Sequence, residues 1–237
     1  MSSGYVVGVG AGQCGLPLLA HILGSKSESR VVLDRKPLSC SSGDEMVFVQ
    51  RRVAAWKEHP GGGLSGDVSG TLLPLLGDFL ATVPDLRVVV LVRDRTESIG
   101  AWEASLSKLL DGNLNHWTTR LELGWIHDPV ESHAYPKYDE ASRVAAIGRY
   151  WDEYNVKVEA LARTYPDRVL VIPSDDLTLT SGVIRLLDFL QIPRDEQRVV
   201  VGGRPESVPQ TVALGYRPRP DSSPERCAVL VPYSGSI

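Results

Sequence analysis

The apolar run YVVGV at residues 5–9 leads into the glycine-rich stretch GVGAGQCGLPLLAHIL at residues 8–23. β-Branched residues, then closely spaced glycines, then an apolar helical pattern predict a strand, a tight turn and a helix. A turn of this kind presents backbone N–H groups at a helix N-terminus, where they can bind phosphate oxygens. The stretch therefore predicts a phosphate-binding turn at the start of an α/β fold.

The rest of the chain repeats this alternation of strands and helices. Short runs rich in β-branched residues predict buried parallel strands at 5–8, 30–33, 87–92 and 168–172. Helical patterns lie at 16–23, 72–80, 96–110 and 139–164, and a last helix, capped by Ser181, is expected before Pro193. Strands alternating with helices predict a layered α/β fold with a central parallel sheet. Ligands of such folds bind at the carboxyl ends of the strands.

Length and composition favour one main domain. The chain has 237 residues, of which 43% are hydrophobic, enough for a single sizeable core. We expect an α/β domain over 1–201 and an irregular C-terminal tail over 202–237, where Gly, Pro and Ser are frequent. The aromatic and histidine-rich stretch 112–138 has no clear period and is expected to form a lid or acceptor segment.

Charge and cysteine content limit the partners. The formal net charge is −4, which argues against a nucleic-acid partner held by a basic surface. The three cysteines, Cys14, Cys40 and Cys227, are widely spaced and follow no metal-ligand or disulfide pattern, so we expect a reduced, cytoplasmic setting and no metal. The first strand begins too early for a signal peptide, and no apolar run reaches membrane-spanning length.

The glycine turn by itself also fits a dinucleotide-binding protein. Gly10, Gly12 and Gly15 match G-x-G-x-x-G, and Asp34 follows 19 residues after Gly15, at the end of the next predicted strand. In the Rossmann fingerprint an acidic residue at this spacing binds a ribose hydroxyl of NAD(P) or FAD. A strict Walker A motif is absent, because no Gly-Lys-Ser/Thr follows the turn.

Two longer stretches resemble sulfotransferases. VPDLRVVVLVRDRTESIGAW (83–102) is similar to the family's third-strand region, and residues 147–193, from IGRYWDEY to LLDFLQIP, are similar to its long helix, strand, acidic turn and last helix. GDVSGTLLPLL (66–76) resembles the family's segment before the third strand. The resemblance covers roughly 5–193 and implies a three-layer, P-loop-NTPase-like α/β fold. It also implies direct in-line transfer of a sulfuryl group from 3′-phosphoadenosine-5′-phosphosulfate to a hydroxyl or amine, without a metal. The short chain and the lack of a membrane-anchor pattern favour a small-molecule acceptor, and we expect a monomer or homodimer.

The resemblance assigns the donor site residue by residue. The turn would hold the 5′-phosphate, and Arg93, at the end of the third predicted strand, would bind the 3′-phosphate through paired, charge-assisted hydrogen bonds. Two departures from the family matter most: Gln13 replaces the usual Lys or Arg, and Ala101 replaces the serine that contacts the 3′-phosphate. Cys14 and Leu16 also stand where Ser and Thr are common in the family. Ser98, one helical turn earlier, could compensate, and Arg95, in place of the family's proline, could add positive charge; otherwise the chain is a catalytically degraded binding protein. The donor-site residues are Gly10, Ala11, Gly12, Gln13, Cys14, Gly15, Leu16, Arg93, Ser98 and Ala101.

Transfer to a hydroxyl also needs a base, and the resemblance offers three candidates besides a leaving-group role for Gln13. Glu45 lies where glycan sulfotransferases place a catalytic glutamate; alternatively it is a solvated carboxylate at a helix start. Asp67 lies near the position at which cytosolic sulfotransferases carry their catalytic histidine; alternatively it is a turn or cap residue. His59 precedes a turn and otherwise is a surface residue.

Two groups of aromatic residues complete the sequence predictions. Trp117 and Trp125, in the irregular stretch, are candidates for an apolar wall around the acceptor. Tyr150, Trp151 and Tyr154 lie in the long predicted helix, and we expect them to pack against the domain core.

Overall fold

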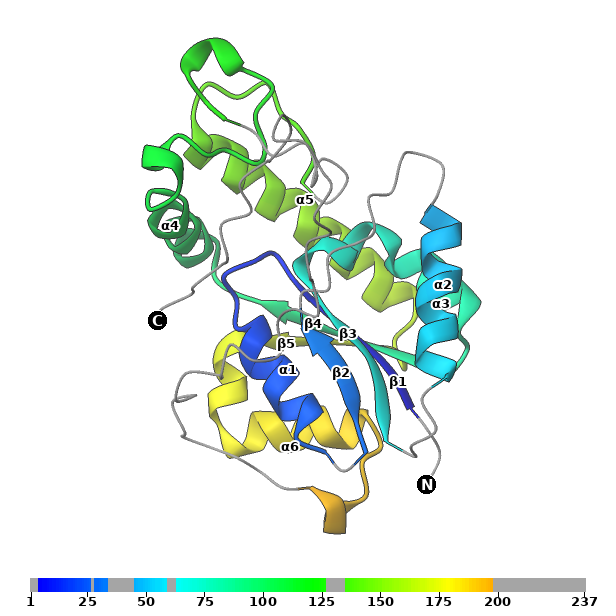
Figure 1. The fold of residues 1–237 in the computed structure, drawn as a ribbon. Helices are drawn as coiled ribbons and strands as arrows, with labels where there is room; N and C mark the ends of the chain where they lie inside the picture. Colours follow the sequence, from blue (N-terminus) through cyan, green and yellow to red (C-terminus); the bar gives the residue numbers. More distant parts are fainter. Residues whose placement is uncertain (1–3, 27, 34–44, 59–62, 127–134, 198–237) are drawn as a thin grey trace, which may run out of the picture. The chain divides into compact units, whose positions relative to one another are not determined.

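The computed structural model describes residues 4–26, 28–33, 45–58, 63–126 and 135–197 (Figure 1). Its elements, with 3-10 helices labelled η, are β1 (Gly4–Gly10), α1 (Leu16–Gly24), β2 (Arg30–Leu33), α2 (Glu45–Lys57), β3 (Leu64–Val68), η1 (Gly70–Leu75), α3 (Leu76–Thr82), β4 (Leu86–Val92), α4 (Arg95–Leu106), η2 (Leu110–Gly112), η3 (Leu121–Leu123), α5 (Arg143–Thr164), β5 (Val169–Pro173), η5 (Ser174–Thr178), α6 (Thr180–Phe189) and η6 (Arg194–Glu196). The predicted tail from 202 lies outside the described residues, so the predicted domain boundary stays a prediction.

The central sheet has five strands in the order β2-β3-β1-β4-β5, and every described pairing is parallel. The predicted parallel sheet is therefore confirmed, and four of its strands follow the predicted runs. β3 was not predicted, because its residues LSGDV are mostly small or polar. This strand pairs with β1 on one side and β2 on the other, and β1 approaches it closely at Gly66, where a Cβ would lie 1.7 Å from the carbonyl oxygen of Val6. Only glycine fits at such a backbone contact.

The strand order decides against the dinucleotide-binding alternative. In a Rossmann sheet β2 lies directly beside β1, so an acidic residue after β2 can reach a ribose held at the first glycine turn. Here β3 separates β2 from β1. Asp34 lies outside the described residues, but the strand that precedes it is two positions away from the glycine turn.

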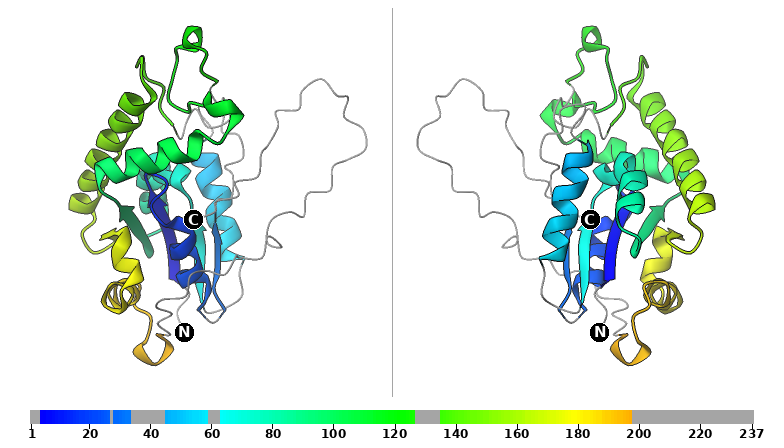
Figure 2. Two further views of the ribbon diagram at one scale, coloured as in Figure 1. Left: turned by 90° about the vertical axis from the view of Figure 1, so that its left-hand side faces the viewer. Right: turned by 90° about the vertical axis from the view of Figure 1, so that its right-hand side faces the viewer.

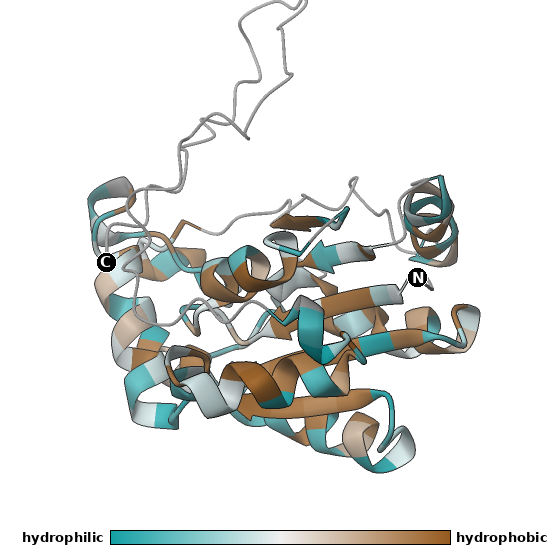
Figure 3. Ribbon diagram, turned by 90° about the horizontal axis from the view of Figure 1, so that it is seen from below, coloured by the Kyte–Doolittle hydropathy of each residue, from teal (hydrophilic) through white to brown (hydrophobic). Residues whose placement is uncertain are grey.

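Helices cover both faces of the sheet and complete the predicted three-layer arrangement (Figures 1 and 2). The core on one face joins apolar residues of α1 and α6 to the strands. The core on the other face joins residues of α2, α3, α4 and α5 to the strands. Figure 3 shows hydrophobic residues concentrated on the central strands, as expected for a parallel sheet buried on both sides.

Two helix predictions need correction. The single helix predicted over 72–80 is divided into η1 and α3, and Pro74 lies inside η1, where it cannot donate a backbone hydrogen bond. The cap predicted at Ser181 is wrong, since α6 already begins at Thr180 and has no side-chain cap.

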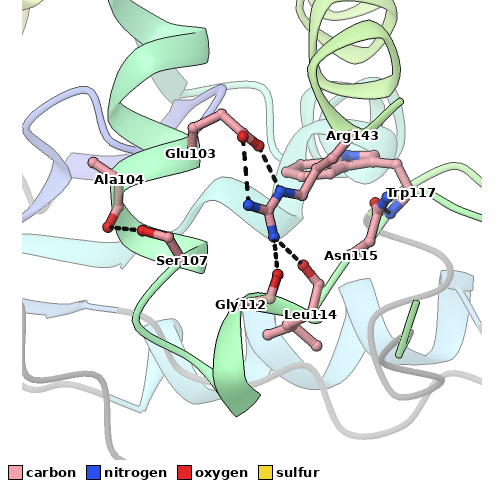
Figure 4. Close-up of polar contacts among 8 residues, drawn as sticks. All are labelled: Glu103, Ala104, Ser107, Gly112, Leu114, Asn115, Trp117 and Arg143. Carbon is pink, nitrogen blue, oxygen red and sulfur yellow. Dashed lines mark hydrogen bonds and ion pairs between the residues drawn. The ribbon is translucent and has the colours of Figure 1, made fainter. Parts of the chain in front are cut away.

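The irregular stretch after α4 projects beyond the amino end of α5 (Figures 1 and 2). Its described part contains η2, η3 and two isolated bridges, Leu114 with Ile126 and Thr118 with Tyr138. Buried Arg143, at the start of α5, anchors it: the guanidinium donates to the carbonyl oxygens of Gly112 (2.7 Å) and Leu114 (3.0 Å) and pairs with Glu103 of α4 (Figure 4). Residues 127–134 lie outside the described part, so the lid stays a prediction.

Candidate functional site

The glycine turn joins β1 to α1 at the carboxyl edge of the sheet. Gly12, Gln13 and Gly15 have left-handed backbones, with φ of 89°, 51° and 85°. Gly15 occupies the N-cap position of α1, and no side chain in the described part of the chain caps this helix. An uncapped helix start at the carboxyl edge of a parallel sheet suits phosphate oxygens. Pro17, in the first turn of α1, contributes no amide to such a site.

Two side chains of helix α4 form hydrogen bonds with the glycine turn. The indole Nε1 of Trp102 donates to the carbonyl oxygen of Ala11 (2.9 Å), and Gln13 Nε2 donates to Ser105 Oγ (3.3 Å). The Trp102 ring also lies directly over Gly12, where a Cβ would come within 2.1 Å of its Cζ2 atom. Gly12 is therefore required both by its backbone conformation and by this aromatic contact.

Arg93 lies where the sequence resemblance expects it, next to the turn. It follows β4, and its Nη1 donates to the carbonyl oxygen of Gln13 (2.9 Å). Its Nε forms an ion pair with Glu97, one turn into α4 (3.1 Å). The carbonyl oxygen of Arg93 accepts a hydrogen bond from Trp151 Nε1 of α5 (3.1 Å). The structure thus brings Arg93 and Gln13 together, while their roles stay predictions.

The other predicted donor-site residues of α4 share one helical face. Ser98, Ala101, Trp102 and Ser105 are spaced three and four residues apart, and Trp102 and Ser105 contact the turn, so this face points toward it. Ser98 is buried on this face. Ser105 was not predicted, although its position one turn beyond Ala101 could have indicated it.

Three further hydroxyl groups near the turn were missed by sequence reasoning. Ser174 follows β5, and its Cβ lies 4.0 Å from the position of a Cβ on Gly15. Ser69 and Thr71 follow β3, their hydroxyl oxygens are 2.9 Å apart, and the Ser69 N–H donates to the carbonyl oxygen of Gly8 on β1. Ser174 could have been identified from its position two residues after the predicted strand 168–172. Ser69 had no such signal, since β3 was not predicted.

The candidate bases occupy different environments. Asp67, on β3, is only 2% exposed, and its carboxylate pairs with Arg52 and accepts a hydrogen bond from Trp56 Nε1 (2.9 Å), both from α2. Its oxygens are thus held by α2, as in a structural ion pair. Glu45 is the first residue of α2 and is partly exposed. His59 lies outside the described residues.

The aromatic predictions are half correct. Tyr150 and Tyr154 are buried in the core, as expected for helix packing. The prediction that Trp117 forms an acceptor wall is wrong, because this ring is 0% exposed and packs 5.1 Å from the ring of Trp102. Trp125 stacks under the Arg143 guanidinium, 5.2 Å from ring centroid to Cζ.

A cavity of about 780 Å³ lies at the carboxyl ends of β4 and β5, between these strands and α5. Arg93, Glu97 and Ser174 line it on the side nearest the glycine turn, and Trp151, Val158 and Ala162 line it from α5. This volume is in the range of small-molecule sites. Among the described residues no group of His, Cys, Asp and Glu is arranged to hold a metal ion. Within the same ranges, no helix is long and apolar enough to cross a membrane.

Comparison with known proteins gives matches among solved structures. No protein-family model and no curated protein matches the sequence. A sulfotransferase from Alicyclobacillus acidocaldarius is 15% identical, with a TM-score of 0.50 over 86% of this chain and 87% of that one. Mouse sulfotransferase SULT7A1 complexed with PAP is 11% identical, with a TM-score of 0.50 over 80% of this chain and 60% of that one. Together with the five-stranded parallel sheet, these matches show that the chain has a sulfotransferase-like fold.

Proposed function

We propose that this protein is a sulfotransferase that moves a sulfuryl group from 3′-phosphoadenosine-5′-phosphosulfate to a hydroxyl or amine of a small molecule. The observation that carries this proposal is the left-handed glycine turn at the carboxyl edge of the sheet, in direct contact with Arg93. The sulfotransferase-like fold supports it, as does the PAP complex of the mouse structure.

The donor would lie across the glycine turn. Backbone N–H groups at the turn and at the start of α1 would bind its 5′-phosphate oxygens, with the helix dipole favouring negative charge there. The nucleoside would extend toward Arg93, Ser174 and the adjoining cavity. The guanidinium of Arg93 would bind the 3′-phosphate.

The reaction proposed is a single in-line displacement. The acceptor oxygen or nitrogen forms a bond to sulfur, while the bond between sulfur and the bridging phosphate oxygen breaks. The acceptor proton passes to a base, and 3′-phosphoadenosine-5′-phosphate leaves. Glu45 is the stronger described candidate for the base, because Asp67 is held by Arg52 and Trp56. Helix α2 begins at the carboxyl edge, since it returns the chain from the end of β2 to the start of β3.

Gln13 would face the leaving phosphate without a charge. Its amide can donate a hydrogen bond to a bridging oxygen, and its contact with Ser105 fixes the orientation of the side chain. A Gln13→Lys variant tests this role. Faster turnover would identify a disabled ancestral site, whereas slower turnover would show that the turn is adapted to glutamine.

The first experiment is calorimetric titration of the full chain with 3′-phosphoadenosine-5′-phosphate, with NAD(H) in a parallel titration. We expect micromolar binding of the bisphosphate and none of NAD(H). Arg93→Ala should weaken bisphosphate binding by about 2 kcal/mol, roughly thirtyfold, because a charged hydrogen-bond partner is lost. Binding of NAD(H) alone would overturn the proposal. Bisphosphate binding without transfer to a panel of phenols, alcohols and amines would instead support the degraded binding protein.

A further inference from the structure

The guanidinium that is expected to bind the donor already has a carboxylate partner. Arg93 Nε pairs with Glu97 at 3.1 Å, and Arg93 Nη1 donates to the carbonyl oxygen of Gln13. The Glu97 side chain is 54% exposed and lines the cavity beside Arg93. A ligand group that reaches Arg93 from the cavity therefore meets Glu97 as well.

The charges around this position are unfavourable for an added dianion. Among the described residues, four carboxylates and two guanidiniums line the cavity: Asp94, Glu97, Glu159, Asp175, Arg93 and Arg163. Arg95 offers no further positive charge here, since both ends of its guanidinium bind Asp152 on α5 (2.9 and 3.0 Å). Ala101 has no hydroxyl to donate. The predicted partners of a 3′-phosphate would then be Arg93, which is in contact with a carboxylate, and the neutral hydroxyl of Ser98.

We propose that Glu97 is a specificity-determining residue for the nucleotide: it competes with a 3′-phosphate for Arg93 and favours a free 3′-hydroxyl. The inference rests on the proposed function, in which the nucleoside extends from the glycine turn toward Arg93. A carboxylate accepts a hydrogen bond from a ribose hydroxyl and repels a phosphate, the same physical contrast that separates NAD from NADP sites. The site would then bind adenosine 5′-phosphate nearly as well as 3′-phosphoadenosine-5′-phosphate. Adenosine 5′-phosphosulfate becomes a competent donor class alongside its 3′-phosphorylated form.

The test compares two ligands that differ only in the 3′-phosphate. Calorimetry on the full chain gives the dissociation constants of adenosine 5′-phosphate and 3′-phosphoadenosine-5′-phosphate for the wild type and for Glu97→Gln. Glu159→Gln is the matched control, because it removes the same charge from the α5 wall of the same cavity. Glu97→Gln in an Arg93→Gln background shows whether the effect passes through Arg93. Thermal unfolding of each variant verifies that it is folded.

We expect wild-type discrimination between the two ligands of less than about tenfold. Glu97→Gln should raise it by about tenfold, through tighter binding of the bisphosphate with adenosine 5′-phosphate unchanged. Glu159→Gln should change it less than threefold, and the Arg93→Gln background should abolish the gain. If both ligands bind and Glu97→Gln leaves their ratio unchanged, or if Glu159→Gln shifts it as much, the role of Glu97 is refuted while the proposed function stands. If neither ligand binds any variant, the proposed function fails and the inference fails with it.

Discussion

Gly12 and Gly15 form a matched pair on which the structure of the turn can be tested. Both have strongly positive φ, 89° and 85°, so an alanine at either position meets nearly the same backbone strain, about 1 to 2 kcal/mol. Their surroundings differ. A Cβ at Gly12 would lie 2.1 Å from Trp102 Cζ2, whereas at Gly15 the nearest atoms are 4.0 Å away.

The additional cost at Gly12 follows from what holds Trp102. The indole is buried, donates to the carbonyl oxygen of Ala11 and packs against Trp117 and Tyr135 with ring centroids 5.1 and 5.9 Å away. Displacing it costs about 1 kcal/mol for the hydrogen bond and about 1 to 3 kcal/mol for overpacking. We therefore expect Gly12→Ala to lower the free energy of unfolding by about 3 to 6 kcal/mol, and Gly15→Ala by about 1 to 2 kcal/mol.

Urea unfolding followed by tryptophan fluorescence measures both costs, and an unchanged m value shows that the comparison is valid. A Trp102→Leu background supplies the control, since it removes the ring that the new methyl group would strike. In that background the two alanine substitutions should cost the same within about 1 kcal/mol. Equal costs in the wild-type background would refute the account of Trp102 as the support of the turn.

Three further predictions concern stability. Arg143→Met should lower the free energy of unfolding by urea by about 3 kcal/mol, because two carbonyl oxygens and Glu103 lose their partner. The exposed control Arg149→Met should lower it by less than about 1 kcal/mol. Similar costs for the two variants would contradict the anchoring role of Arg143. Asp67→Asn should lower the free energy of unfolding by about 2 to 3 kcal/mol, because it leaves the largely buried Arg52 unpaired. A cost near zero would contradict the structural role of Asp67 and restore it as a candidate for the catalytic base. The hydroxyl of Tyr154 is buried without a hydrogen-bond partner among the described residues, so Tyr154→Phe should leave stability unchanged or raise it by about 1 kcal/mol at pH 8. Burial raises the pKa of Tyr154 well above its usual value. The free energy of unfolding of the wild type should therefore fall relative to that of Tyr154→Phe as the pH rises above about 10, by up to about 1.4 kcal/mol per pH unit. Parallel curves of unfolding free energy against pH for the two proteins would contradict this.

The sequence by itself determined the elements whose signals are local. Strands β1, β4 and β5 and the turn between β1 and α1 can be recognised from short stretches of sequence. Burial on both faces of a strand selects a run of β-branched residues, and a left-handed turn selects glycine, so both signals lie within a few positions. These elements located the carboxyl edge of the sheet, and the resemblance to sulfotransferases selected Arg93 at the end of a predicted strand. The similarity of 83–102 and 147–193 to sulfotransferases then indicated the fold that the structure has.

Only the tertiary structure decided the features that depend on contacts distant in the sequence. β3 is defined by its pairing with β1 and β2, and its position between them removes the dinucleotide alternative. Asp67 is held by α2, and Gln13 is oriented by Ser105, 92 residues further along the chain. A local pattern shows how much of a residue is buried, but the partner that buries it is set by the packing of the whole sheet. The turn could therefore be predicted from the sequence, whereas the carboxylate beside Arg93 that we expect to govern its ligand could be identified only in the folded chain.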